Sequence, residues 1–453
     1  MAMKPFIRRS FGVALAGMAF AGCATARVDE RRLHWEPIFT SQAQEPTGRA
    51  NTGEEIQTLG ELLQFAELRN PGLHAAFDRW TAALEQVPQS RALPDPRISY
   101  AEFLESVQTR VGPQERRLGV SQMFPLFGKL GLRGEVASHA ADAAGGRFEQ
   151  ERLDLHLRIV RLWNDYFYLG RSIAVTEENV RLVENLEHAA LAQYSTGKAS
   201  HSAVVRAQVE LGRLEVRLRS LRDQRGPFLA MLNAEVDRPS DAPIGWPTAP
   251  AETRSGFDAQ LERSPQLAAM LAVADREDAA ARLAGKNGIP DLTLGFEYIV
   301  TGEAVMPNVL DSGQDASMAT ASINIPLWFS RNGAERSQAR ARHSAAQRDL
   351  AQLHNRLRAN LERARFEVRD ADRRVELYEL TLLPKARESF AVTRDAFTSG
   401  DAGFLDLIDT QRTLLEFQLA HQRALADQAT RRAELAVLVG LEPLAEPIRR
   451  SHP

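Results

Sequence analysis

The sequence has a single cysteine, no long hydrophobic run and no large excess of charge of one sign. Cys23 is the only cysteine among the 453 residues, which excludes a disulfide framework. No apolar run reaches the about 18–20 residues that a helix needs to cross a bilayer. The formal net charge is −3 and the isoelectric point is near 6.4, which argues against a nucleic-acid-binding protein. Charged residues make up 25% of the chain, a share typical of globular or helical proteins.

Motifs of enzymes and metal sites are also missing. The ten histidines are scattered without an HExxH pattern, and there is no CxxC or GxSxG. Gly197-Lys198 lacks the upstream glycine and the following Ser or Thr of a phosphate-binding loop. We therefore expect no catalytic residues, no cofactor and no metal site.

The N-terminus has the layout of a secretory signal. Three basic residues precede the short apolar run 11–20, and Ala21-Gly22-Cys23 follows it. This pattern predicts a signal peptide over residues 1–22 and a lipid anchor on Cys23. The alternative is a chance cysteine inside a cleaved signal peptide. Ala24 stands where bacterial lipoproteins that stay at the inner membrane have aspartate, so the lipoprotein resemblance favours the outer membrane.

The chain contains a long internal repeat. The segment Tyr194-Ser-Thr-Gly-Lys-Ala199 is echoed by Phe397-Thr-Ser-Gly-Asp-Ala402, an offset of 397 − 194 = 203 residues. Gln208 and Gln411 keep the same offset. Upstream, Pro94-Asp95 is echoed by Pro290-Asp291. A repeat this long exceeds the 20–50 residues of a solenoid unit and indicates a duplicated half-protein.

Each half shows two short stretches of alternating polarity followed by a very long helical pattern. In the second half, Leu292, Leu294, Phe296, Tyr298 and Val300 share one face of a predicted strand. The alternation predicts strands at about 97–107 and 115–124 in the first half, and at about 291–300 and 317–327 in the second. Long helices are expected at about 129–232 and 334–439. A helical segment of 60 residues would be about 90 Å long.

Four strands cannot close a barrel, and open strand edges cannot face lipid, so membrane insertion would require assembly of several chains. Two copies would give a barrel filled by side chains, whereas three copies would give 12 strands and room for a lumen. Aromatic residues flank the strands as the interfacial girdle of a membrane barrel does. These residues are Tyr100, Phe124, Phe127, Phe296, Tyr298, Trp328 and Phe329. The alternative is two small hairpins packed on helices.

The lipoprotein signal, the duplicated order of hairpin and long helices, and the Tyr/Phe-x-x-Gly-x-Ala break in each half together resemble the TolC family of outer-membrane efflux factors. The resemblance implies a mainly α fold with a small β part. Three copies would form a 12-stranded barrel above a long periplasmic helical tunnel. Such a homotrimer is the exit duct of a tripartite efflux pump or a type I secretion system.

The resemblance also implies partners and a location. The partners are outer-membrane lipid, a periplasmic adaptor protein and an inner-membrane resistance–nodulation–division pump. The phrases Ser121-Gln-Met-Phe-Pro125 and Gly128-Lys129 are similar to the heavy-metal branch of the family. The expected location is the bacterial outer membrane, with a lipid anchor and a periplasmic helical part. The cargo stays open between heavy-metal ions and drugs.

The predicted organisation has five parts. They are the signal peptide 1–22, a lipidated tail 23–57, repeat 1 at 58–257 with its linker 233–257, repeat 2 at 258–440, and a C-terminal tail 441–453. The alternative function is a periplasmic adaptor or structural lipoprotein of an export system. An adaptor should show one helical hairpin flanked by Gly-rich β domains, whereas this chain predicts two hairpins and two strand pairs.

In the resembling fold, the long helices turn back at the periplasmic tip. We expect the first turn at Gly170-Arg171, and the offset of 203 puts the second turn at Arg373, beside Asp370 and Asp372. The aspartates would then form a ring of carboxylates that gates the tunnel mouth and selects cations. The alternative is an ordinary solvated helix end.

Gly197 and Gly400 are expected to interrupt helices midway, where glycine costs about 1 kcal/mol relative to alanine. The resemblance places them at an equatorial belt around the tunnel. The alternative is a simple kink or helix end.

Overall fold

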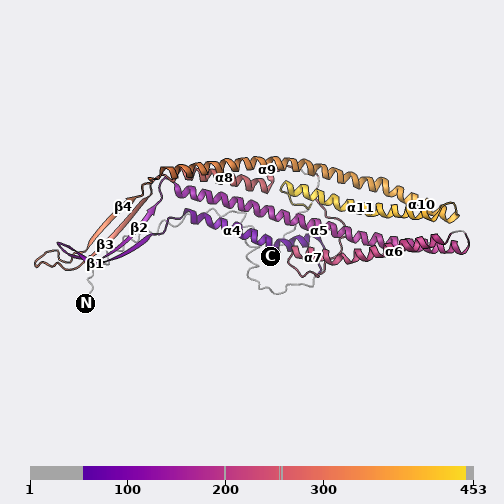
Figure 1. Ribbon diagram of the computed structural model, residues 1–453, viewed down its shortest axis with the longest axis horizontal. Helices are drawn as coiled ribbons and strands as arrows, with labels where there is room; N and C mark the ends of the chain where they lie inside the picture. The colour runs from indigo at the N-terminus through magenta and orange to yellow at the C-terminus, as the bar shows by residue number, and fades with distance from the viewer. Residues whose placement is uncertain (1–54, 198–199, 255, 257–258, 445–453) are drawn as a thin grey trace. The chain divides into compact units, whose positions relative to one another are not determined.

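The computed structural model describes residues 55–197, 200–254, 256 and 259–444 (Figure 1). The chain divides into two compact units. We call the described parts of 79–145 and 269–351 the strand unit. The described parts of 55–78, 146–268 and 352–444 form the hairpin unit. The predicted signal peptide, Cys23 and most of both predicted tails lie outside the described residues.

The strand unit contains one four-stranded antiparallel sheet in the order β1-β2-β3-β4. The strands are β1 Arg97–Thr109, β2 Gly112–Phe124, β3 Leu292–Thr301 and β4 Ala316–Ile323. The two hairpins of the duplicated halves therefore join through β2 and β3, and β1 and β4 are the edges. A sheet with two free edges has backbone groups left to pair with further strands.

Helices make up most of the remaining described chain. They are α3 Leu59–Arg69, α4 Pro71–Arg91, α5 Lys129–Ser195, α6 His201–Asp223, α7 Arg225–Glu235, the 3-10 turn η2 Leu261–Arg263, α8 Pro265–Lys286, α9 Phe329–Leu377, the π-helical turn η3 Tyr378–Leu382, α10 Leu383–Ser399 and α11 Phe404–Leu438. No helix within these described ranges is long and apolar enough to cross a membrane.

The first helix of the hairpin unit begins at a capping box. The Thr58 hydroxyl accepts a hydrogen bond from the Glu61 amide at 3.2 Å, and the Glu61 carboxylate accepts one from the Thr58 amide at 3.4 Å. Two amides at the helix start are thereby satisfied, which stabilises a helix by about 1 kcal/mol. The next helix begins similarly, because the Asn70 side chain accepts from the Leu73 amide at 2.9 Å and Pro71 has no N–H that would need an acceptor.

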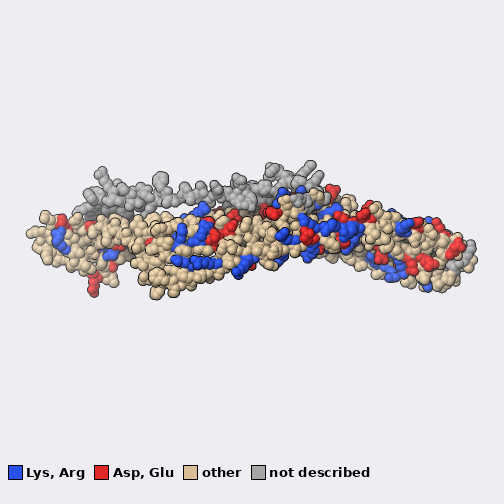
Figure 2. Space-filling model, turned by 90° about the horizontal axis from the view of Figure 1, so that it is seen from above, with Lys and Arg blue, Asp and Glu red and all other residues tan. Residues whose placement is uncertain are grey.

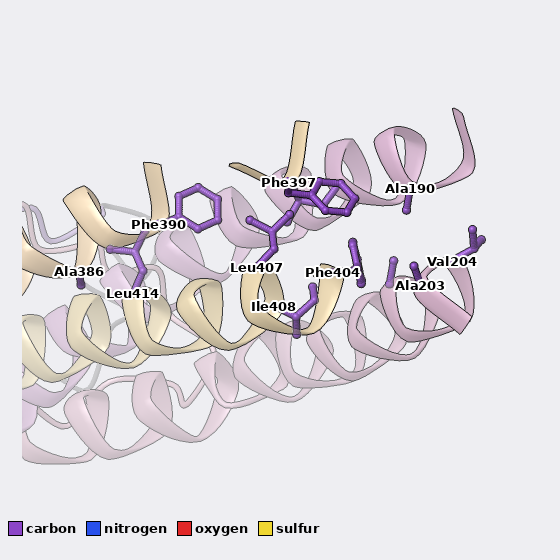
Figure 3. Close-up of a cluster of buried hydrophobic side chains, with 12 residues drawn as sticks. Ala190, Ala203, Val204, Ala386, Phe390, Phe397, Phe404, Leu407, Ile408 and Leu414 are labelled. Carbon is purple, nitrogen blue, oxygen red and sulfur yellow. The ribbon is translucent and has the colours of Figure 1, made fainter. Parts of the chain in front are cut away.

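One apolar core of the hairpin unit lies between two helical hairpins, α5–α6 and α10–α11. Side chains from all four helices form one apolar cluster (Figure 3). The cluster combines small residues such as Ala190 and Ala203 with large ones such as Phe397 and Phe404. The cluster contains Leu186, Ala190, Ala203, Val204, Ala207, Ala386, Phe390, Phe397, Phe404, Leu407, Ile408 and Leu414.

The fourth strand ends at Ile323, four residues before the predicted end at 327. At Asn324 one of the two ladder bonds is lost. The Asn324 amide still donates to the Asp291 carbonyl at 3.4 Å, but the Asp291 amide donates to the Asn324 side-chain oxygen at 2.5 Å. Pro326 follows and has no amide hydrogen to continue the ladder.

Candidate channel elements

The sheet has one apolar face. Phe296 lies opposite Val120 and Ala319, and Leu294 lies opposite Gln122 and Ala321. Leu294 and Phe296 are 45% and 44% exposed, although both are large apolar side chains. The alternation expected for β3 is therefore seen in the strand register, and it leaves an apolar surface uncovered in the single chain.

The opposite face of the sheet is polar and carries small residues. A Cβ atom at Gly119 would lie 2.6 Å from the Ser99 hydroxyl, and one at Gly295 would lie 2.6 Å from the Thr320 hydroxyl. The absence of these side chains gives the neighbouring hydroxyls room. Arg117 and Glu297 on this face lie 3.6 Å apart. This face can therefore line a hydrated space, whereas the apolar face cannot do so favourably.

The predicted girdle aromatics fall at two levels along the strands. Phe124, Phe127, Trp328 and Phe329 lie at or next to the junction of strands and helices, where Phe124 pairs with Leu292. Tyr100 and Tyr298 lie on either side of Leu118, at one level further along the sheet. Tyr298 is six residues beyond Leu292, which corresponds to about 20 Å along a strand. Phe296 lies between the two levels. The spacing is close to the apolar band of about 25 Å in membrane barrels.

A buried lysine holds the junction together. The Lys129 side chain is 3% exposed, and its Nζ donates to the Asp291 carboxylate at 2.7 Å and to the Ile289 carbonyl at 2.6 Å. Asp291 also accepts from the Leu126 amide at 3.4 Å. This pair joins residues 162 positions apart, so local sequence patterns do not predict it. The Lys129–Asp291 pair gives Lys129, which follows the first strand hairpin, a structural role.

The backbone at the junction is left-handed at two successive residues. Phe127 has φ of 59° and Gly128 has φ of 76°. A left-handed conformation is uncommon for a phenylalanine and has to be maintained by its surroundings. Here Lys286 Nζ donates to the Phe127 carbonyl at 2.8 Å. The result is a Phe127 side chain that is 63% exposed.

The helical hairpins turn at Gly197 and Gly400, which corrects the predicted positions of the turns. α5 ends at Ser195 and α6 begins at His201, whereas α10 ends at Ser399 and α11 begins at Phe404. The two glycines have φ of 78° and 95°. They occupy the left-handed position that ends a helix, and Figure 1 shows both turns at the same end of the hairpin unit. The prediction of equatorial breaks within helices was therefore wrong for both glycines.

An aromatic pair crosses each turn at matching positions of the repeat. The rings of Tyr194 and His201 are 5.3 Å apart, and those of Phe397 and Phe404 are 5.5 Å apart. Adding 203 converts the first pair into the second. The second pair is buried, whereas Tyr194 is 46% exposed. The Gln193 side chain joins the two turns by donating to the Phe397 carbonyl at 3.1 Å.

Gly170 and Arg171 do not form a turn. α5 continues through both residues to Ser195. A Cβ atom at Gly170 would lie 2.8 Å from the Trp246 ring, so the glycine leaves the space in which the indole packs against α5. Trp246 also stacks on Tyr166 at 4.5 Å. Arg171 donates from Nε to the Gln422 side chain of α11 at 3.2 Å. Both residues thus serve packing between elements of the hairpin unit.

Asp370, Asp372 and Arg373 lie inside α9, away from either hairpin turn, which corrects the prediction of a tip gate. Asp370 pairs with Arg373 at 3.2 Å and with Arg374 at 2.7 Å on its own helix. Asp372 instead reaches α11 and accepts from Arg432 at 2.7 Å. The carboxylates are therefore compensated by arginines of the same chain. The offset of 203 carried the first misplaced turn into the second half.

A charged cluster is buried in the hairpin unit. Arg152 donates to Glu67 at 3.2 Å and to Glu442 at 2.9 Å, and His156 lies 3.1 Å from Glu67. Burial lowers the pKa of Arg152, but the charges of Glu149, Glu67 and Glu442 outweigh this effect and raise it. The cluster ties α3, α5 and the segment after α11 together. Its members are far apart in sequence, so no local motif marks them.

An open polar cavity of about 390 Å³ lies in the hairpin unit between α5, α9 and α11. Its charges are largely paired, since Arg161 donates to Glu434 at 2.7 Å and Arg431 donates to Glu434 at 2.8 Å. Burial raises the pKa of Asp154, which lines the same cavity. Within the part of the chain that is described, no three His, Cys, Asp or Glu side chains are grouped to hold a metal ion. The cavity offers neither a nucleophile–base pair nor a ligand cage.

Comparison with known proteins agrees with these elements. The sequence matches the Outer membrane efflux protein family over residues 62–227 and 257–441. It is 23% identical over 396 residues to the cobalt-zinc-cadmium resistance protein CzcC of Cupriavidus metallidurans, covering 85% of this chain and 88% of that protein.

Two solved structures have similar folds. VceC, an outer membrane protein of Vibrio cholerae, has a TM-score of 0.71 at 19% identity, over 86% of this chain and 97% of VceC. The outer membrane channel MtrE of Neisseria gonorrhoeae has a TM-score of 0.70 at 18% identity, over 85% of this chain and 89% of MtrE.

The fold is that of outer-membrane channels with helical and strand parts, and the chain belongs to the Outer membrane efflux protein family. The predicted resemblance, the mainly helical fold class and the outer-membrane location are confirmed. The chain is an efflux channel protein, and members of its family act as trimeric channels in tripartite systems. The two helical hairpins and the one four-stranded sheet of the described residues also contradict the alternative of a single-hairpin adaptor.

Proposed function

We propose that three copies of this chain close their four-stranded sheets into one 12-stranded barrel and form the exit channel for heavy-metal cations. The observation that carries the proposal is the two-faced sheet with two free edges. β1 of one copy would pair with β4 of the next, so that no edge faces lipid. The apolar face with Leu294 and Phe296 would contact lipid. The polar face with Arg117 and Glu297 would line the pore.

The choice of cargo rests on the similarity to a cobalt-zinc-cadmium resistance protein over most of both chains. Metal cations need no binding site in a passive exit duct, and a hydrated lumen lets them pass with their water shells. Energy and selectivity would come from an inner-membrane resistance–nodulation–division pump and its periplasmic adaptor. The adaptor would meet the channel at the turns around Gly197 and Gly400.

We also propose that the mature chain starts at acylated Cys23, because a basic start and a short apolar run precede it. Two or three acyl chains give firm membrane attachment at about 0.8 kcal/mol per buried CH₂. Mass spectrometry of the mature N-terminus tests this. An unmodified peptide beginning at another residue would contradict the anchor, although the strands could still insert.

The function is tested in two steps. Membrane-extracted protein should migrate as a heat-sensitive trimer and conduct ions in planar bilayers. Cells that lack their own exit channel should then regain tolerance to cobalt, zinc and cadmium when the chain is expressed with a matching pump and adaptor. A monomer without conductance would refute the channel. A conducting trimer that restores drug tolerance but no metal tolerance would refute only the cargo.

A further inference from the structure

The strand–helix junction of the strand unit exposes several large apolar side chains. Phe127 is 63% exposed, and the turn before α9 exposes Ile325, Leu327, Trp328 and Phe329 by 65–78%. The two turns are held by one set of contacts, because Asp291 accepts from the Leu126 amide and its own amide donates to Asn324. The junction therefore presents its aromatic residues from a fixed backbone. Aromatic residues in such positions lie at the headgroup level of a membrane.

Directly next to these aromatics, the junction carries arginines without a counter-charge. The first 20 residues of α9 contain five arginines and a single acid, Glu335. Within the described residues, Arg331 and Arg336 form no ion pair, and neither does Arg133 in the second turn of α5. All three side chains are exposed. A space-filling view shows Lys and Arg gathered beside the mainly uncharged surface of the strands (Figure 2).

The carboxylates nearby are already engaged. Asp291 pairs with Lys129 at 2.7 Å, Glu335 accepts from Asn287 at 2.5 Å, and Glu135 pairs with Arg282. Asp95 lies just before β1, two residues from Arg97, and these charges offset each other formally. The partner of Glu335 is a neutral amide, so Glu335 keeps its negative charge. The three arginines outnumber this single carboxylate, and the junction keeps a net positive charge next to the exposed apolar residues.

The three arginines also lie at a suitable depth. At 1.5 Å per helical residue, Arg331 is about 3 Å and Arg336 about 10 Å along the helix from Phe329. Arg133 is about 6 Å along α5 from Lys129. A headgroup layer is about 5–8 Å thick, and a long arginine side chain can extend toward it. Arginines further along α9, such as Arg348, would lie beyond this layer.

We propose that Arg133, Arg331 and Arg336 bind the phosphate groups of anionic phospholipids at the inner leaflet, directly beneath the belt formed by Phe127, Trp328 and Phe329. This inference rests on the proposed function in one respect, namely that the strands insert in a membrane. The arginines would fix the depth of the channel and make its stability depend on anionic lipid. Their planar guanidinium groups match phosphate oxygens in pairs, which lysine does not do.

The test compares phosphatidylglycerol with phosphatidylcholine of the same acyl chains. Detergent-purified full-length trimer is titrated with each lipid, and native mass spectrometry counts the bound molecules. Each arginine near an anionic surface contributes about fivefold in affinity, so three predict a preference of about 100-fold for phosphatidylglycerol. The variant R133Q/R331Q/R336Q should lose nearly all of this preference. The control R206Q/R217Q/R219Q removes the same charge from exposed positions of α6 and should keep it.

Three results would overturn the proposal. The junction variant could keep the wild-type preference, or the α6 control could lose as much as the junction variant. The junction variant could also fail to form trimers in neutral lipid, which would mean that these arginines contact a second copy of the chain. Failure of the channel proposal looks different, since the wild type would then give no trimer and no conductance in any lipid.

Discussion

Gly197 and Gly400 are separated by 203 residues, and both adopt the left-handed backbone that ends a helix, with φ of 78° and 95°. Ser and Thr precede each glycine in opposite order, and in both copies their hydroxyls donate back to carbonyls of the last helical turn. Thr196 donates to the Gln193 carbonyl at 3.0 Å, and Ser399 donates to the Ala396 carbonyl at 3.0 Å. The helix ends at the two glycines are thus alike in backbone conformation and in hydroxyl contacts.

The first prediction concerns the cost of removing this glycine. Gly400→Ala should destabilise the hairpin unit by about 1–2 kcal/mol, because an alanine in the left-handed region is strained even where no atom lies within 4 Å. Gly212→Ala in α6 is the matched control, since it is also free of neighbours within 4 Å but helical. It should stabilise the protein by up to about 1 kcal/mol. Thermal unfolding followed by circular dichroism measures both. A change of the same sign in the two variants would contradict the turn geometry.

The second prediction concerns Gly170. Gly170→Ala should destabilise the protein by about 1–3 kcal/mol, because its methyl group would lie 2.8 Å from the Trp246 ring and displace it from Tyr166. Gly131→Ala in the same helix meets no atom within 4 Å and should be neutral or stabilising. The double variant Gly170→Ala/Trp246→Ala should lose less stability than the sum of the losses of the two single variants, because without the indole the added methyl group has nothing to clash with. Additive losses would mean that the glycine does not serve the indole.

The third prediction concerns the two faces of the sheet. Leu294→Arg should destabilise the membrane-inserted protein by about 2–4 kcal/mol, because the side chain lies on the apolar face opposite Gln122 and Ala321. Thr293→Arg, one residue away on the polar face, should fold and alter conductance. The fraction of heat-modifiable trimer and single-channel recordings distinguish the two. Normal assembly of the Leu294→Arg variant together with loss of assembly in the Thr293→Arg variant would reverse the assigned faces.

The sequence was sufficient for elements that depend on local periodicity. Strand faces follow from alternation, since successive side chains point to opposite sides. The offset of 203 correctly related Gly197 to Gly400. An offset shows which residues of the two halves correspond, but it does not show where in the fold they lie. The sequence also contains a stronger signal for the turns. A glycine after Ser and Thr at the end of a helical pattern indicates a helix C-terminus. That signal would have placed both turns.

The misassigned residues depend on contacts between distant parts of the chain. Gly170 is explained by Trp246 in the linker, and Asp372 by Arg432 in α11. Lys129 and Asp291 belong to different halves of the duplication. A local pattern can show that a glycine or a charge is unusual in a helix, but the partner that accounts for it appears only when the helices are packed.

The fourth prediction concerns pH. Burial lowers the pKa of His421 in α11, while Glu379 opposes and Arg387 adds to this effect. The unfolded chain therefore takes up a proton more readily, so the contribution of neutral His421 is present above about pH 6.5 and is lost as pH falls through its lowered pKa. Leu218 holds the matching position in the first repeat, since 218 + 203 = 421. His421→Leu should remove this loss of stability between pH 7 and pH 5.

The measurement is the difference in melting temperature between wild type and His421→Leu at each pH, which cancels titration of the shared carboxylates. This difference should grow in favour of the variant as the pH decreases. A difference that stays constant from pH 7 to pH 5 would mean that the histidine titrates equally in the folded and unfolded chains.

The last prediction separates Asp372 from Asp370. Asp372→Ala removes contacts with Gln428 at 2.9 Å and Arg432 at 2.7 Å on α11, so it should loosen α9 from α11 and cost about 0.5–1 kcal/mol. Asp370→Ala removes only pairs within α9 and should cost less than about 0.5 kcal/mol. Thermal unfolding measures these losses, and limited proteolysis should detect a more accessible α9 only in Asp372→Ala. Neither variant should change cation block in planar bilayers, because both residues lie inside a helix and are paired with arginines. Loss of cation block in the double variant would return these aspartates to a pore-lining role and contradict the structural one.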